Sequence, residues 1–196
     1  MNKGDQTRHM IIEKAAELFN KSGYDGCSLS DIMKATNLKK GGIYNHFKNK
    51  DEIALESFDY LFQKLANLYR TSTHGATSSR EKLEQIFNMF ENHYSNPEIK
   101  GGCPIANTAV YSADTHPQLR EKVNKAIQTI EDYITIKIDE GKVSGEFRKD
   151  LSSRETAIFI LAAFEGAVVL TRSKQDKKYL RNTVSQLRQY LMNLMA

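Results

Sequence analysis

The sequence has few of the residues that interrupt helices or crosslink chains. Its 196 residues include three prolines, two cysteines and no tryptophan. Because proline removes a backbone donor and breaks helices, its scarcity favours long uninterrupted helices. Cys27 and Cys103 lie far apart in the chain, so they lack the close spacing of a metal-binding pair, and we expect no disulfide in a reducing compartment.

Membrane-spanning and secretory signals are also missing. No apolar run reaches the roughly 20 residues that cross a bilayer, and residues 1–8 are polar, unlike a signal peptide. We therefore expect a cytoplasmic protein with no membrane partner.

Catalytic and metal-binding motifs are missing as well. Gly141-Lys142 lacks the upstream glycine and the following hydroxyl residue of a phosphate loop. We find no Gly-x-Ser-x-Gly, His-Glu-x-x-His or Cys-x-x-Cys pattern, and the five histidines are scattered. We expect neither an enzyme nor a bound cofactor or metal.

The net charge of +4 is confined to the first quarter of the chain. Residues 1–50 hold nine Lys/Arg and five Asp/Glu, whereas residues 51–196 hold nineteen of each. A basic module on a neutral body suggests a polyanion bound at one end. The alternative is a chance asymmetry of four charges.

Apolar residues recur at helical spacing through nearly the whole chain, and no strand pattern competes. Helices are predicted over residues 7–22, 29–36, 39–47, 49–71, 80–94, 105–112, 117–140, 152–172 and 176–194. We predict an all-α fold of about nine helices. Its domains would be a helix-turn-helix domain over residues 1–49 and a ligand-binding and dimerisation domain over residues 50–196.

The second and third predicted helices are short and joined by a tight turn. Ser28 and Asp31 form a capping signature before the second helix, and Asn37 tolerates the left-handed conformation that a tight turn requires. Two such helices behind a longer one match the helix-turn-helix plan, in which the second short helix enters the major groove.

The third predicted helix carries side chains suited to DNA. Lys39 and Lys40 lie at its N-terminus, which attracts phosphate, and glycine at positions 41 and 42 lets the backbone approach closely. The candidate DNA-binding residues are Ser28, Ser30, Lys39, Lys40, Gly41, Gly42, Tyr44, Asn45, His46, Lys48 and Lys50. The alternative is a helix-turn-helix used only for packing.

The run from Ser28 to Lys50 resembles the DNA-binding signature of TetR-family regulators. The shared marks are Asp31-Ile32, Lys40-Gly41, Ile43-Tyr44, His46-Phe47 and Lys50. The resemblance implies a repressor that binds a pseudo-palindromic double-stranded DNA operator as a homodimer and responds to a small-molecule effector.

Four positions depart from that signature. Met33 replaces a small residue, Asn37 a turn glycine, Lys39 a serine and Gly42 a threonine or serine. The last two exchange hydroxyl contacts for charge and bare backbone, which changes the expected phosphate contacts but not the expected fold.

The eighth predicted helix is apolar almost all round, so it should be buried on more than one side. The resemblance implies that the last two helices form a four-helix bundle with a second copy. The candidate interface residues are Ile158, Ala162, Glu165, Gly166, Val169, Val184, Leu187 and Leu191. The alternative is the central core helix of a monomer.

An effector pocket is expected among the middle helices, mainly because of the resemblance. Its candidate residues are Phe58, Phe62, Phe87, Phe90, Cys103, Asn107, Tyr111, Tyr133 and Phe159. Such aromatic stripes are more often plain core than pocket.

Residues 101–107 resemble the entry into a helix in one branch of TetR-like proteins. A cysteine near a helix N-terminus, such as Cys103, can have a lowered pKa and react with electrophiles. The competing interpretation is an inert thiol.

We therefore expect a dimeric repressor released from its operator by a small-molecule inducer, with electrophiles as one candidate class. One alternative is an all-helical small-molecule binding or catalytic protein with a vestigial DNA-binding domain. Another is a non-specific nucleoid-type binder, which would show steep salt dependence without sequence preference.

Overall fold

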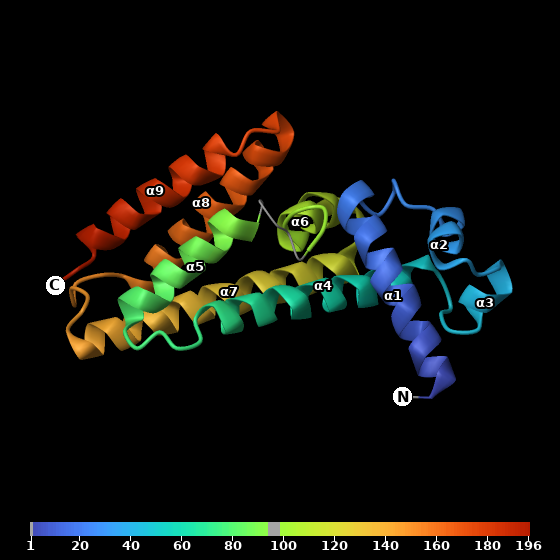
Figure 1. The fold of residues 1–196 in the computed structure, drawn as a ribbon, viewed down its shortest axis with the longest axis horizontal. Coiled ribbons are helices and arrows are strands. Elements are labelled where there is room, and N and C mark those ends of the chain that lie inside the picture. The colour runs from blue at the N-terminus through green and yellow to red at the C-terminus, as the bar shows by residue number, and fades with distance from the viewer. Residues whose placement is uncertain (1, 94–98) are drawn as a thin grey trace. The chain divides into compact units, whose positions relative to one another are not determined.

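The computed structural model describes residues 2–93 and 99–196, and within them the chain folds into helices α1–α9 (Figure 1). They are α1 (Lys3–Ser22), α2 (Leu29–Thr36), α3 (Lys40–Tyr44), α4 (Lys50–Ser72), α5 (Ser79–His93), α6 (Pro104–Thr115), α7 (Pro117–Ser144), α8 (Ser153–Lys174) and α9 (Lys178–Asn193). These ranges contain no strand, only an isolated bridge between Phe147 and Met195. The predicted all-α fold is confirmed; Tyr94, the predicted end of the fifth helix, lies outside the described residues.

α1, α6 and α7 are each four residues longer than their sequence pattern predicts. α1 begins at Lys3 because Asn2 forms a capping box: its side chain accepts from the Asp5 backbone N–H at 2.9 Å, and the Asp5 carboxylate accepts from the Asn2 N–H at 3.2 Å. α7 continues past Gly141, which the sequence predicts as the start of a turn, and ends before Gly145, whose φ is +79°. The stop is therefore the glycine that adopts the left-handed region.

The described residues divide into two compact units. Unit 1 holds residues 2–65 and 99–124, and unit 2 holds residues 66–93 and 125–196. Unit 1 thus combines α1–α3 with the first part of α4, with α6 and with the start of α7. The division by function into residues 1–49 and 50–196 stays a prediction.

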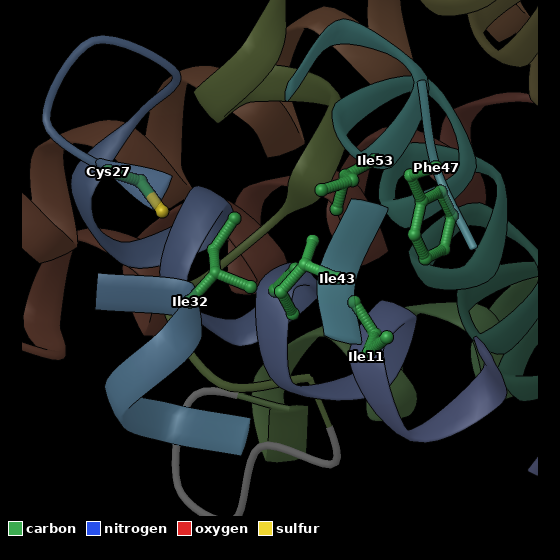
Figure 2. Close-up of a cluster of buried hydrophobic side chains, with 7 residues drawn as sticks. Ile11, Cys27, Ile32, Ile43, Phe47 and Ile53 are labelled. Carbon is green, nitrogen blue, oxygen red and sulfur yellow. The ribbon is translucent and has the colours of Figure 1, made fainter. Parts of the chain in front are cut away.

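The core of unit 1 joins its first four helices (Figure 2). Ile11 and Ala15 of α1 meet Ile32 of α2, Ile43 of α3 and Ile53 of α4. Cys27 and Phe47 complete the cluster, and all of its members are at most 2% exposed. Burying each large side chain contributes about 1.5–3 kcal/mol, so this cluster is what holds the short α3 in place.

Unit 2 has its own core, in which α9 packs on both α5 and α8. Phe90 of α5 and Phe164 of α8 stack face to face. The Thr171 hydroxyl accepts from the Leu180 backbone N–H at 3.1 Å, which fixes the start of α9 against α8. Arg188 of α9 forms an ion pair with Glu91 of α5 at 3.1 Å.

α8 is the one helix in the described part of the chain that is long and apolar enough to cross a membrane. In unit 2 it packs against α9, and 44% of its most apolar stretch is buried. A packed core helix meets the same length and composition criteria, so this finding is weak evidence for a membrane span.

Gly141 tests the packing of unit 2. A Cβ at this position would lie 2.3 Å and 2.5 Å from two atoms of the Phe147 ring and 2.9 Å from the Ser79 Cβ. Gly141→Ala should therefore destabilise the fold by about 1–3 kcal/mol, the usual cost of overpacking a core, and thermal unfolding would measure it. Gly41→Ala is the matched control, because nothing lies within 4 Å of its Cβ position. A Gly141→Ala variant that melts at the wild-type temperature would contradict this account.

Candidate DNA interface

α2 begins at a reciprocal cap that the sequence predicts. The Ser28 hydroxyl accepts from the Asp31 backbone N–H at 3.2 Å, and the Asp31 carboxylate accepts from the Ser28 N–H at 2.9 Å. The Ser28 hydroxyl also donates to that carboxylate, and these hydrogen bonds hold the pKa of Asp31 below its usual range. The cap fixes where α2 starts, and hence its rotation on the core.

The turn after α2 ends the helix at Asn37. This residue has φ 55° and ψ 32°, in the left-handed region, and its N–H donates to the Met33 carbonyl. Asparagine is among the few residues other than glycine that adopt this conformation readily. The replacement of the usual turn glycine is therefore compatible with a tight helix-turn-helix connection.

α3 is anchored on one side and exposed on the other. Ile43 and Phe47 are buried in the unit 1 core, whereas Tyr44 is 44% exposed. A Cβ at Gly41 would have nothing within 4 Å, so the backbone there can be approached closely. Asn45 is exposed and His46 half-buried. The structure therefore brings most of the predicted DNA-binding residues to one exposed region.

The exposed region carries positive charge that the chain itself does not neutralise. Lys39, Lys40 and Lys48 are exposed. Within the described ranges no carboxylate forms an ion pair with any of the three. Ser28 and Ser30 of the α2 start are also exposed. Uncompensated lysines beside an open backbone are suited to phosphate contacts.

Lys50 makes a contact within the chain that the sequence pattern does not predict. Its ammonium donates to the Tyr24 carbonyl at 2.6 Å and lies 4.0 Å from the centroid of the Tyr24 ring. In this structure Lys50 therefore joins the start of α4 to the segment after α1, and its contact with DNA stays a prediction. Lys50 occupies the lysine position of the DNA-binding signature, but its hydrogen-bond partner in this structure is Tyr24 of the same chain.

Arg8 of α1 stabilises the segment that follows α3 from its buried side, a role that the sequence pattern does not predict. Its guanidinium forms ion pairs with Glu52 and Glu56 of α4 and lies 4.4 Å from the centroid of the Phe47 ring. The hydrogen bond to Glu56 raises the pKa of Arg8. Glu52 also accepts from the Lys48 backbone N–H at 2.7 Å. One arginine thus links α1, α4 and the residues that follow α3.

Three of the predicted pocket residues line one cavity of unit 1. Phe58 of α4 and Asn107 and Tyr111 of α6 border a cavity of about 30 Å³, together with residues at the end of α1. Phe62 stacks on Phe58 with ring centroids 6.5 Å apart. Cys103 caps the start of α6 and is 3% exposed.

The other predicted pocket residues lie in unit 2 and have different roles. Phe87 and Phe90 are fully buried core, and the Tyr133 hydroxyl shares a hydrogen bond of 2.8 Å with Thr73. Phe159 is 50% exposed and packs edge-on against Tyr190 of α9. Phe159 therefore lies on an open side of α8, and its role in an effector pocket stays a prediction.

The predicted partner-binding residues separate into an exposed and a buried group. Ile158, Ala162, Gly166 and Val169 are exposed on one side of α8, and Glu165 is half-buried. Val184, Leu187 and Leu191 are at most 2% exposed and belong to the unit 2 core, and their place in an interface between two copies stays a prediction. A groove of about 220 Å³ lies beside the exposed group. Phe159 and Leu187 line it together with four residues that the prediction did not name, Ala163, Asn182, Thr183 and Gln186.

Family models match both parts of the chain. The model for bacterial regulatory proteins of the tetR family matches residues 11–56, and the model for the tetracyclin repressor-like C-terminal domain matches residues 79–187. The first range includes α2 and α3 with their turn. The second covers more than half of the chain.

Solved structures and curated relatives agree with these matches. The structure resembles a TetR transcriptional regulator from Chloroflexus aurantiacus J-10-FL, with 37% identity, a TM-score of 0.96, and 100% of this chain and 98% of that chain covered. A TetR-family regulator from Cytophaga hutchinsonii has 30% identity and a TM-score of 0.92 over 100% and 98% of the two chains. The HTH-type transcriptional repressor DhaR of Mycobacterium sp. is 24% identical over 88% of this chain and 86% of its own. The biofilm operon regulator IcaR of Staphylococcus aureus (strain Newman) is 30% identical over 65% and 71%.

Substitutions on the exposed side of α3 should weaken DNA binding without unfolding the protein. We expect Lys40→Ala and Tyr44→Ala each to reduce affinity for a preferred duplex by about tenfold or more, because each removes a contact to phosphate or base. Lys40→Ala should also lower the slope of log affinity against log salt by about one. Fluorescence anisotropy at several salt concentrations measures both effects. Lys149→Ala, in an exposed loop of unit 2, is the control; wild-type affinity of both α3 variants would contradict the assignment.

Proposed function

The chain belongs to the TetR family and is a DNA-binding transcriptional regulator rather than an enzyme, and we propose that it represses its target genes until a small molecule releases it from a pseudo-palindromic operator. The repressor role is supported by relatives whose names describe repressors or negative regulators. The protein acts in the cytoplasm, where its DNA is.

One observation carries the proposal. α3 is held from behind by Ile43 and Phe47 and presents Tyr44, Lys40 and the open backbone of Gly41 outward. A helix used only for packing would not leave uncompensated lysines and an exposed tyrosine on its outer side. The arrangement favours direct DNA contact over the packing-only alternative.

We propose that the exposed side of α8 joins two copies of the chain. Ile158, Phe159, Val169 and Leu170 are each between 45% and 50% exposed, which is unusual for four large apolar residues on one helix. With the adjoining groove beside α9 they form a face that a second copy would bury. Two-fold symmetry would then present two copies of α3 about 34–36 Å apart, or a multiple of it, to match successive turns of DNA.

The cavity of unit 1 is the proposed place for an inducer, which would have to widen it, because about 30 Å³ has room for little more than a water molecule. Its walls combine aromatic rings with two side-chain amides, Asn20 and Asn107, a composition typical of small-molecule sites. A ligand there would contact α1 and α6 at once, and by binding one arrangement of the two better it would shift the population away from the DNA-binding form.

An electrophilic inducer is the narrower form of this proposal. Cys103 supports it by its place at the start of α6, where a thiolate is favoured. Its burial, at 3% exposed, counts against ready attack by a reagent in solution.

The test is a footprint on the DNA beside the gene that encodes this chain, repeated with competitor DNA and rising salt. Protection of a two-fold symmetric site that survives competitor supports a sequence-specific regulator. Binding without sequence preference, lost steeply with salt, would favour the nucleoid-type alternative. Candidate inducers are then added one by one, and the compound that removes the footprint identifies the effector.

If the exposed side of α8 joins two copies, a charge introduced there should disrupt the dimer. Ile158→Glu should convert the dimer to a monomer and reduce operator affinity by about 100-fold or more, because an unpaired carboxylate cannot be buried at an apolar face. Light scattering after size exclusion gives the mass, and anisotropy gives the affinity. Val143→Glu, at a position 90% exposed on α7, is the control. A dimeric Ile158→Glu variant would place the interface elsewhere.

If the electrophile hypothesis holds, the two cysteines should be labelled at different rates. Burial raises the pKa of the Cys27 thiol to about 11, so near neutral pH almost none of it is thiolate and it should react slowly, with its rate rising as the pH approaches 11. Cys103 should react faster than Cys27 with a limiting amount of alkylating agent. Mass spectrometry of the peptides measures the two labelling rates. Equal, slow labelling of both residues would exclude the electrophilic inducer and leave the rest of the proposal intact.

A further inference from the structure

The end of α1 is joined to α6 by two buried side-chain amides. Asn20 is 4% exposed, and its amide nitrogen donates to the carbonyls of Lys100 at 2.8 Å and Gly102 at 2.9 Å. From the first turn of α6, the Asn107 amide nitrogen donates to the side-chain oxygen of Asn20 at 2.9 Å and to its carbonyl at 3.0 Å. It also donates to the Gly101 carbonyl at 2.8 Å. We call this set of hydrogen bonds the amide clasp.

The backbone before α6 is shaped to meet α1. Gly101 has φ +99°, and a Cβ there would lie 3.0 Å from both the carbonyl carbon and the oxygen of Asn20. Only glycine fits this approach without displacing backbone. The bonds of the amide clasp are therefore made across a close contact of two backbones, and a looser loop could not form them.

A second contact lies one turn further along the same surface. The Tyr24 ring stacks between Phe19 of α1 and Tyr111 of α6, with centroids 6.0 Å and 5.4 Å away. Its hydroxyl donates to the Asp51 carboxylate at the start of α4. α6 thus contacts the end of α1 through one polar and one aromatic set of residues, and it lies beside that end in Figure 1.

The amide clasp acts on α3 through the rigid core of unit 1. Ile11 and Ala15 of α1 share one buried cluster with Ile43 of α3, so a rotation of α1 carries α3 with it. None of the amide atoms of Asn20 or Asn107 belongs to the exposed region around α3. Without an inducer, both residues can therefore influence DNA binding only by setting the orientation of α1 on α6.

We propose that Asn20 and Asn107 are positioning residues that fix the angle of the DNA-binding helices on α6 and so make the protein selective for the spacing between operator half-sites. A dimer must place two copies of α3 in register with two half-sites. If the angle is fixed, one spacing fits and neighbouring spacings do not. If α1 pivots on α6, the dimer can bind operators of several spacings. Its affinity for each of them is then lower than the affinity of the rigid protein for its preferred spacing. This inference rests on the proposed dimeric, operator-binding function.

The experiment compares spacing profiles of full-length wild type and Asn107→Ala. The operator is selected from a random duplex library with the wild type, and versions with one or two base pairs inserted or removed at its centre are made, with a single half-site as reference. We expect the wild type to lose at least 30-fold in affinity at the altered spacings. Asn107→Ala should lose fivefold or less there, with half-site affinity unchanged. Asn124→Ala, an exposed asparagine of α7 in the same unit, is the matched control and should keep the wild-type profile.

Each outcome decides the question. A flattened profile with unchanged half-site affinity supports the proposal, and Asn20→Ala should reproduce it without adding to it in the double variant, because both residues act through one set of bonds. An unchanged profile, or an equal loss at all spacings and at the half-site, would overturn it. Asn107→Ser, which keeps a small polar group, replaces Asn107→Ala if the latter does not fold, and is judged by the same profile. A wild type that selects no duplex would instead refute the proposed function itself.

Discussion

The burial of Ile43 and Phe47 against α1 is the constraint on which the rest of the structure depends. α3 has only five residues, too few to be stable as an isolated helix. Its conformation is therefore maintained by packing, through a cluster that also takes in Ile32 and Ile53. Because one side of α3 is committed to that cluster, its other side must face outward, and the residues suited to DNA lie there.

Polar contacts then determine the direction in which this cluster holds α3. The cap at Ser28 fixes the start of α2, and Arg8 joins α1 to Glu52 and Glu56 of α4. Apolar packing is tolerant of small rotations, whereas hydrogen bonds between buried groups are strongly dependent on distance and angle. The same division of roles recurs at the end of α1. The Tyr24 ring contributes apolar contact area there, and the hydrogen bonds between the amides of Asn20 and Asn107 fix the orientation of α1 on α6.

Much of the DNA interface could be predicted from local sequence, and much of the body could not. The Ser28–Asp31 cap, the left-handed Asn37 and the anchors Ile43 and Phe47 depend on residues a few positions apart, and each lies where the pattern predicts. The contacts of Lys50 and Phe159 could not be predicted in this way. Lys50 binds Tyr24, 26 positions away, and Phe159 packs against Tyr190 of α9. Apolar periodicity shows that a helix has a buried side, but not which element covers it.

The sequence by itself determined the helical class, the helix-turn-helix with its caps and turn, and the concentration of positive charge in the first quarter of the chain. These follow from helical periodicity, from capping chemistry and from composition, all of which act over one or two turns. Only the tertiary structure decided that α6 joins the unit of α1, that Arg8 supports Phe47, and that Asn107 bonds to the end of α1 across 87 positions of sequence. Such contacts depend on which surfaces meet once the helices pack, because a side chain's partner across a core is set by the shape of both elements and not by its own neighbours in the chain.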